Sequence, residues 1–211
     1  MGRKSLKDTR RQEIIQMFYQ VAKKEGLENT SIAKIAVVMA INPSLIMHYF
    51  QTRDDLISGL IDFMLDKYQL IFDIATQRHD TPEAVLLKVI DRLFSKDWNH
   101  LFDDGLFYSC YSLTFRNAVI QEKYKTMLDS LRHKLARLIQ DCANAGALQT
   151  ADAYQTADLI FVLVDGAYYY LSLVSDKTEY EQKLGQYKQQ ALTLLDPSKA
   201  LNGPVIPADR P

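Results

Sequence analysis

Cysteine is scarce in this chain of 211 residues, and the arrangements that carry common catalytic or metal chemistry are missing. The two cysteines, Cys110 and Cys142, lie far apart, with no CxxC pair and no Cys/His spacing suited to a metal. There is no phosphate-binding loop, G-x-S-x-G motif or Cys/His pairing. We therefore expect two free, buried thiols, with a disulfide or redox switch as the alternative. No metal, no cofactor and no enzymatic activity is predicted.

Long apolar runs are also missing. The longest, residues 159–174 (LIFVLVDGAYYYLSLV), has 16 residues with Asp165 among them, which is short for a membrane span. The basic start MGRKSL is not followed by an apolar segment, so no signal peptide is expected. These absences predict a soluble, cytoplasmic protein without a membrane partner.

No proline occurs between Pro82 and Pro197, and strand-like alternation of polar and apolar residues is absent. Apolar residues instead recur every three or four positions, a pattern that predicts an all-α fold. Residues 197–211 contain four prolines and are expected to be irregular or disordered. Beyond the N-terminal quarter, the expected helices span residues 54–77, 82–96, 101–116, 119–145, 152–174 and 177–195.

Positive charge is concentrated in the first quarter of the chain, although the formal net charge of the whole is −1. Residues 1–53 hold nine Lys or Arg and four Asp or Glu, a net +5, which leaves −6 for the rest. A basic segment on an acidic body favours a polyanionic partner for that segment alone. A solvated basic arm would give the same pattern, so charge alone does not decide between the two.

The basic quarter contains three expected helices of unequal length. Apolar residues from Ile14 to Ala22 mark the first, which Gly26 should end. Two short helices are expected over residues 30–38 and 43–50, joined by about four residues. A longer helix followed by two short ones at this spacing is typical of a helix-turn-helix unit.

Local capping signals place the starts of these helices. Either Thr30 or Ser31 is the expected N-cap of the second helix, and Asn42 that of the third. Thr52 and Thr81 should start the fourth and fifth, since each is followed by acidic residues in the first helical turn.

The third helix has a narrow buried edge and a wide outer face. Ile41, Ile46 and Phe50 can form the buried edge. The second short helix of a helix-turn-helix unit lies in the major groove of DNA and needs a free face. The residues left toward the outside are Pro43, Ser44, Leu45, Met47, His48 and Tyr49.

Residues 26–57 (GLENTSIAKIAVVMAINPSLIMHYFQTRDDLI) carry a specific arrangement of residues. It consists of a glycine, Thr-[ST]-x-x-x-Ile-Ala, a turn, a short helix ending in His-Tyr-Phe, and an arginine before an acidic, apolar helix. This arrangement resembles the DNA-binding segment of the TetR family of bacterial transcriptional regulators. The rest of the chain resembles that family only in its length and helical pattern. The matching residues are Gly26, Thr30, Ser31, Ile35, Ala36, His48, Tyr49, Phe50, Arg53, Asp54, Asp55 and Leu56.

The resemblance implies an all-α homodimer. Residues 1–53 would form a three-helix, helix-turn-helix domain that binds double-stranded DNA at an inverted-repeat operator. Residues 54–196 would form an antiparallel helical domain that binds a small-molecule effector and pairs with a second subunit. The implied phosphate contacts are Thr30, Tyr49 and Arg53, and the implied contacts to base edges are Pro43, Ser44, Leu45, Met47 and His48.

Two positions depart from the family pattern. Ala40 stands in the turn where glycine is usual, and alanine tolerates a left-handed backbone poorly, so the turn should be less sharp or mildly strained. Met47 stands where tyrosine is frequent, which removes a phosphate contact. Leu45 and Met47 would contact thymine methyl groups, so we expect a preference for A/T-rich sites.

Aromatic residues cluster in two later segments, around Phe107 and around Tyr168. Aromatic residues at helical spacing are compatible with core packing and with a ligand pocket. Asp165, which lies within an apolar run beside Gly166, could pair locally, pair across a subunit interface, or contact a ligand. The last two long helices should form the dimer interface, with Gly166 allowing close approach. The candidate effector-binding residues are Phe107, Tyr111, Phe115, Phe161, Asp165 and Tyr168.

The leading hypothesis is a transcriptional repressor that a small-molecule effector releases from its operator. The alternative is a helical protein-interaction module that does not bind DNA. Salt-dependent binding to duplex DNA would separate the two, because neutralised phosphates release counterions.

Overall fold

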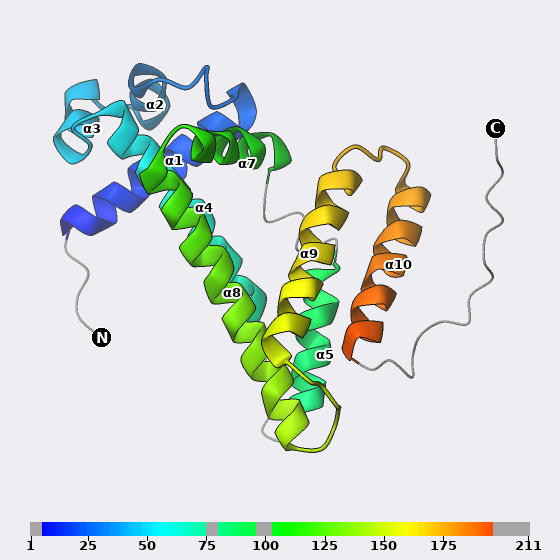
Figure 1. Cartoon of the computed structure of the whole chain (residues 1–211). Helices are drawn as coiled ribbons and strands as arrows, with labels where there is room; N and C mark the ends of the chain where they lie inside the picture. The colour runs from blue at the N-terminus through cyan, green and yellow to red at the C-terminus, as the bar shows by residue number, and fades with distance from the viewer. Residues whose placement is uncertain (1–5, 75–79, 96–102, 196–211) are drawn as a thin grey trace. The chain divides into compact units, whose positions relative to one another are not determined.

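The computed structural model describes residues 6–74, 80–95 and 103–195, and every regular element within these ranges is a helix (Figure 1). The predicted all-α class is therefore confirmed. The chain forms two compact units: Met1–Asp73 with Lys96–Leu131, called here the first unit, and Ile74–Ser95 with Arg132–Pro211, the second unit. The functional boundary expected after residue 53 stays a prediction.

The first unit is built around its N-terminal helix, α1, which packs against α2, α3, α4 and α7. The elements of this unit are α1 (Leu6–Glu25), α2 (Ile32–Met39), α3 (Pro43–Tyr49), α4 (Arg53–Tyr68), the 3₁₀ helix η1 (Gln69–Phe72), α7 (Asp104–Tyr111), the 3₁₀ helix η2 (Ser112–Phe115) and the first half of α8 (Ala118–Asn144).

Capping residues begin and end these helices largely where the sequence indicates. Gly26 follows α1 with φ +87°, and its N–H donates to the carbonyl of Ala22 at 2.9 Å. Of the two candidate N-caps of α2, Ser31 is the one used, since its Oγ accepts from the N–H of Lys34. Thr52 caps α4 by accepting from the N–H of Asp55 at 3.0 Å, as predicted.

Two of the predicted helices end earlier than expected because a 3₁₀ helix follows them, and the helices predicted over residues 82–96 and 152–174 each end three residues early. The one predicted over residues 54–77 ends at Tyr68, where the chain tightens into η1. The one predicted over residues 101–116 ends at Tyr111, where η2 begins. The apolar pattern continues through both 3₁₀ turns, so it does not report the change in hydrogen bonding. The predicted tail, residues 197–211, lies outside the described residues.

The core of the first unit joins α1, α3 and α4. Ile14, Ile46 and Phe50 have no exposed surface. Gly59 on α4 permits this close approach, because a Cβ there would lie 2.8 Å from Cδ1 of Ile15 and 3.2 Å from Cε1 of Phe50. The buried edge predicted for the third helix is thus confirmed, with Ile41 only half-buried.

The described residues of the second unit form four helical segments. Helices α9 and α10 lie side by side and run antiparallel (Figure 1), and α10 also packs on α5. Its core includes Ile160, Phe161 and Leu171 of α9. The segments are α5 (Pro82–Leu93), the second half of α8, α9 (Ala153–Leu171) and α10 (Lys177–Leu195).

Both cysteines are free and fully buried, as predicted. Among the described helices, none alone combines the length and apolar composition needed to cross a membrane. Helices α2 and α3 meet that test only when taken together, and they are bent by 113° at their junction.

Candidate nucleic-acid interface

A sharp turn at Ala40 sets the angle between α2 and α3. The 113° bend lies within the range of about 90–120° that helix-turn-helix units adopt. Ala40 has φ 53° and ψ 42°, and its N–H donates to the carbonyls of Ala36 and Val37. Among the residues that the structure describes, it is the one non-glycine residue with positive φ. Of the two expected outcomes, the strained turn is therefore the observed one.

The start of α3 is held by Asn42 and Pro43. The side-chain oxygen of Asn42 accepts from the N–H of Ser44 at 2.9 Å and from the Ser44 hydroxyl at 2.8 Å. Pro43 occupies the first helical turn, where a missing N–H leaves no bond unmade. Because the Ser44 hydroxyl donates to Asn42, its oxygen is left to accept a hydrogen bond from another molecule.

The outer face of α3 is free of the core. Pro43, Ser44 and His48 are exposed, and 54% of the Met47 surface is accessible. Leu45 and Tyr49 are half-buried. The sequence predicted these six residues on the outer face, and their exposure fits a helix whose free side meets another molecule.

Arg11 of α1 fixes the end of α3, a role that sequence reasoning missed. Its Nη1 donates to the backbone carbonyl of Tyr49, and its guanidinium lies 4.1 Å from the centre of the Phe50 ring. Its Nη2 lies 3.7 Å from a carboxylate oxygen of Asp55 on α4. One arginine thus connects α1, α3 and α4. The available signal was its place one turn before the buried pair Ile14 and Ile15.

The implied phosphate contacts differ in their surroundings. Tyr49 is half-buried, with its ring centre 5.2 Å from that of His48. Arg53 is exposed at the start of α4 and donates to the carbonyl of Leu27 at 3.3 Å. Thr30 is only 3% exposed, and its hydroxyl donates to the carbonyl of Gly26 at 2.7 Å. A phosphate contact from Thr30 would require its hydroxyl proton to leave that carbonyl.

Two cavities lie within the first unit. One, of about 700 Å³, lies between α1, α2 and α4. The other, of about 740 Å³, lies between α4 and α8 and has Lys123 on its wall, ion-paired with Asp62 at 2.6 Å. None of the six candidate effector-binding residues lines either cavity.

Three of those candidates form an aromatic cluster in the first unit. The ring of Phe107 is stacked on that of Tyr111 at 6.3 Å, and the Tyr111 ring meets the edge of Phe115 at 5.7 Å. Phe115 is 77% exposed and Tyr111 39%. Tyr124 of α8 adjoins this cluster, and its buried hydroxyl has no hydrogen-bond partner among the described residues.

The other three candidates belong to the second unit, where each already has a partner. Phe161 is buried beneath the guanidinium of Arg132. Asp165 is ion-paired with Arg132 at 3.3 Å, and Arg132 also binds Asp158 at 2.7 Å. Desolvation raises the pKa of Asp165, with Asp158 adding to it and Arg132 opposing. The Tyr168 hydroxyl donates to the carbonyl of Leu93 at 2.8 Å. The predicted role of these residues in effector binding stays a prediction.

Comparison with known protein families gives a match to the C-terminal part of the chain. The model of a protein family described as the tetracyclin repressor-like C-terminal domain matches residues 81–197. No match was found among curated proteins.

Solved structures share the fold over nearly the whole chain. A TetR transcription regulator from Haloarcula marismortui superposes with a TM-score of 0.77 at 21% identity, covering 90% of this chain and 98% of its own. A TetR-family regulator from Cytophaga hutchinsonii gives a TM-score of 0.75 at 17% identity, covering 90% and 97%. A regulator from Pseudomonas aeruginosa gives 0.69 at 16% identity, with 93% of both chains covered.

Proposed function

Because the chain belongs to the TetR family and is a DNA-binding transcriptional regulator, we propose that it represses transcription from an inverted-repeat operator and is released by a small-molecule effector. The observation that carries the proposal is the exposed outer face of α3, whose two ends are both fixed. A short helix with Ile46 and Phe50 buried and four exposed side chains is suited to the major groove.

The side chains of this surface divide into those that position the protein and those that select a sequence. Tyr49 and Arg53 bind phosphates, which gives affinity without sequence information. Leu45 and Met47 contact thymine methyl groups, and their loss affects only the base pairs they touch. Thr30 acts by ordering the turn before α2, since its hydroxyl is bound to Gly26.

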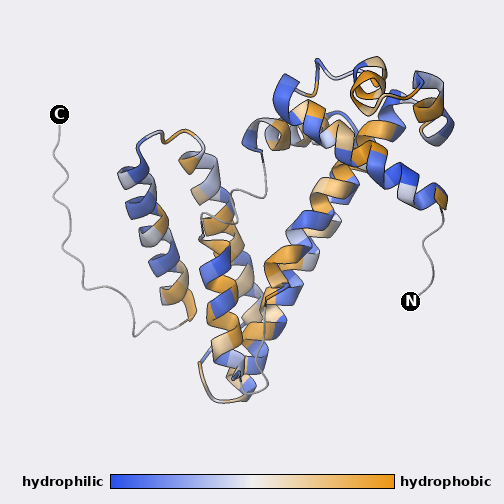
Figure 2. Ribbon diagram, turned by 180° about the vertical axis from the view of Figure 1, so that it is seen from behind, coloured by the Kyte–Doolittle hydropathy of each residue, from blue (hydrophilic) through white to orange (hydrophobic). Residues whose placement is uncertain are grey.

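Dimerisation through α9 completes the proposal, because an inverted repeat requires two copies of α3. Large apolar residues at positions 159, 162, 169 and 173 are exposed, with accessible fractions of 44%, 55%, 65% and 74%. Together with Gly166, they follow the three- and four-residue spacing of one helix face, and a Cβ at Gly166 would meet nothing within 4 Å. Figure 2 shows that most of α10 is hydrophilic, so α9 supplies most of the apolar interface.

The candidate effector-binding residues differ in how readily a ligand could reach them. Tyr111 and Phe115 offer exposed rings to a ligand. Asp165 and Tyr168 would have to exchange existing partners for it. We therefore propose that the aromatic cluster of α7 and η2 makes the first contact with the effector.

The test is a titration of the protein against one operator duplex and its point mutants at several salt concentrations. Arg53→Ala should weaken binding to all sequences and reduce the slope of log K against log salt by up to about one. Arg137→Ala, which removes an exposed arginine from α8 in the second unit, is the matched control and should leave the slope unchanged. Tyr49→Phe should also weaken all sequences alike.

Leu45→Ala and Met47→Ala should instead relax the preference at single T-containing positions. If Leu45→Ala weakens every sequence equally while Arg53→Ala leaves the slope unchanged, the assigned roles are wrong. If the wild type shows no salt-dependent binding to any duplex, a helical protein-interaction module is the better description.

A further inference from the structure

We propose that the cavity between α1, α2 and α4 is a second ligand site, which binds a small aromatic carboxylate through Lys67. It lies in the first unit, between α1 and α2 of the helix-turn-helix segment and α4, and involves none of the candidate effector-binding residues. Its volume of about 700 Å³ is within the range of small-molecule sites, about 300–1,000 Å³. The residues that line it are Glu13, Gln16, Met17, Tyr19, Gln20, Val38, Met39, Phe63 and Lys67.

Lys67 supplies a positive charge at one end of the cavity. Its Nζ lies 3.8 Å from the centre of the Tyr19 ring and 4.8 Å from that of Phe63. It makes no hydrogen bond or ion pair with any residue in the described ranges. Burial and the nearby charge of Lys23 lower the pKa of Lys67. Because ring faces accept no conventional hydrogen bond, the ammonium N–H groups remain available to a carboxylate.

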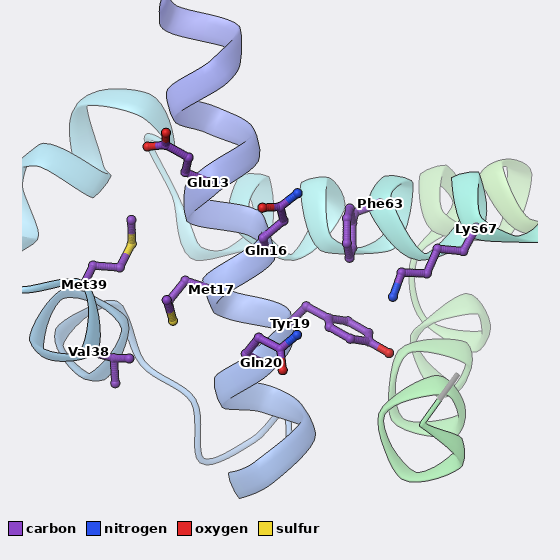
Figure 3. Close-up of a pocket in the computed structure, with 9 residues that line it drawn as sticks. All are labelled: Glu13, Gln16, Met17, Tyr19, Gln20, Val38, Met39, Phe63 and Lys67. Carbon is purple, nitrogen blue, oxygen red and sulfur yellow. The ribbon is translucent and has the colours of Figure 1, made fainter. Parts of the chain in front are cut away.

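The opposite end of the cavity is mostly apolar. The one acidic group there, the carboxylate of Glu13, is ion-paired with Arg10 at 2.6 Å. Figure 3 shows Lys67 and Phe63 projecting from α4 toward Tyr19, with Met17 and Met39 on the other side of α1. Val38, which is 55% exposed, belongs to the same end. Thioether sulfurs pack favourably against aromatic rings, and Gln16 and Gln20 lie between the two ends as hydrogen-bonding groups. A flat apolar body ending in a carboxylate therefore fits the cavity in both chemistry and polarity.

Methyl NMR can test this directly, because the chain has only six methionines. The protein, labelled with ¹³C at the methionine methyl groups, is titrated with 2-naphthoate and with the neutral 2-naphthamide. The naphthoate should shift the signals of Met17 and Met39, assigned with Met→Leu variants, and leave that of Met127 in the α4–α8 cavity unchanged. The amide lacks the negative charge, so it should bind at least about tenfold more weakly than the naphthoate.

Variants separate the role of the charge from that of the fold. Lys67→Gln should weaken naphthoate about tenfold or more and leave amide binding unchanged, whereas Lys67→Arg should retain naphthoate binding. Lys125→Gln, on the exposed surface of α8 where Lys125 pairs with Asp129, is the matched control and should have no effect. The proposal is overturned if acid and amide bind equally to the wild type, or if Met127 shifts in place of Met17 and Met39. The acid–amide comparison needs no variant, so it holds even if Lys67→Gln does not fold.

An occupant would also contact the end of α2. Val38 and Met39 directly precede the Ala40 turn, so a bound carboxylate would favour one position of α2 against α4 and change the affinity for DNA. This consequence rests on the proposed function. The NMR titration contains no DNA, so failure of the site and failure of DNA binding give different results.

Discussion

Ala40 is the residue where the helix-turn-helix unit bears most backbone strain. A left-handed backbone such as that of Ala40 costs an L-residue about 1–2 kcal/mol. Glycine would remove this strain, but it also has more conformational freedom in the unfolded chain, which offsets part of the gain in stability. We expect Ala40→Gly to raise the free energy of unfolding by about 1 kcal/mol and the melting temperature by about 2–4 °C. Thermal and urea unfolding measure both quantities.

Ala33→Gly is the matched control for this prediction. Ala33 is exposed in α2 with an ordinary helical backbone, so glycine there should lower the free energy of unfolding by about 1 kcal/mol. Opposite signs for the two substitutions would support the strain at Ala40. Destabilisation by both would show that the turn gains nothing from glycine.

The two cysteines are expected to be chemically silent in the folded protein. Burial raises the pKa of the Cys110 thiol to about 12, so at pH 8 roughly one thiol in 10,000 is ionised. Cys142 is also fully buried, and burial raises its pKa as well. A thiol-specific chromogenic reagent should therefore react with neither residue at pH 8 until guanidinium unfolds the chain. Rapid stoichiometric reaction of the native protein would contradict this.

At the level of elements, the position of α3 depends on Arg11. Replacing it by methionine keeps an apolar chain over Phe50 but removes the bond to the Tyr49 carbonyl and the charge beside Asp55. We expect Arg11→Met to weaken DNA binding about tenfold for all sequences, because the end of α3 is no longer fixed. Amide hydrogen exchange at Phe50, whose N–H bonds to Ile46, should become faster.

Arg10 provides the control for the lost charge. It is the preceding residue on α1, and it pairs with Glu13 at 2.6 Å on the surface. Arg10→Met should change DNA affinity much less than Arg11→Met at the same salt concentration and leave the exchange at Phe50 unaltered. Equal losses for the two variants would mean that Arg11 contributes only its charge.

Elements with local start signals could be predicted, and elements defined by distant contacts could not. The caps Asn42, Thr52 and Thr81 are visible in the sequence because a side chain bonds to an N–H two or three residues ahead. The outer face of α3 could also be predicted from the sequence, because so short a helix has few buried positions. The contact of Arg11 with Tyr49 joins residues 38 positions apart, and no local pattern announces it.

At the scale of the whole molecule, α9 leaves large apolar side chains exposed to solvent, and no contact within a single chain accounts for that exposure among the described residues. Leu159, Val162 and Tyr169 of α9, with Leu173 just beyond its end, form one apolar stripe, and such a surface is typical of an interaction site. A copy of the same helix, related by a two-fold axis, would cover it with complementary surface. Dimerisation would then bring two copies of α3 to an inverted repeat.

We expect Val162→Glu and Tyr169→Glu each to convert the dimer into monomers at micromolar concentration, because two carboxylates would be buried in an apolar interface without partners. Analytical ultracentrifugation gives the mass, and operator titration should show the accompanying loss of affinity. Val119→Glu, at a residue of α8 that is likewise 65% exposed, is the matched control and should remain dimeric and bind DNA. A wild-type monomer at this concentration, or dimers that persist in both α9 variants, would move the interface away from α9.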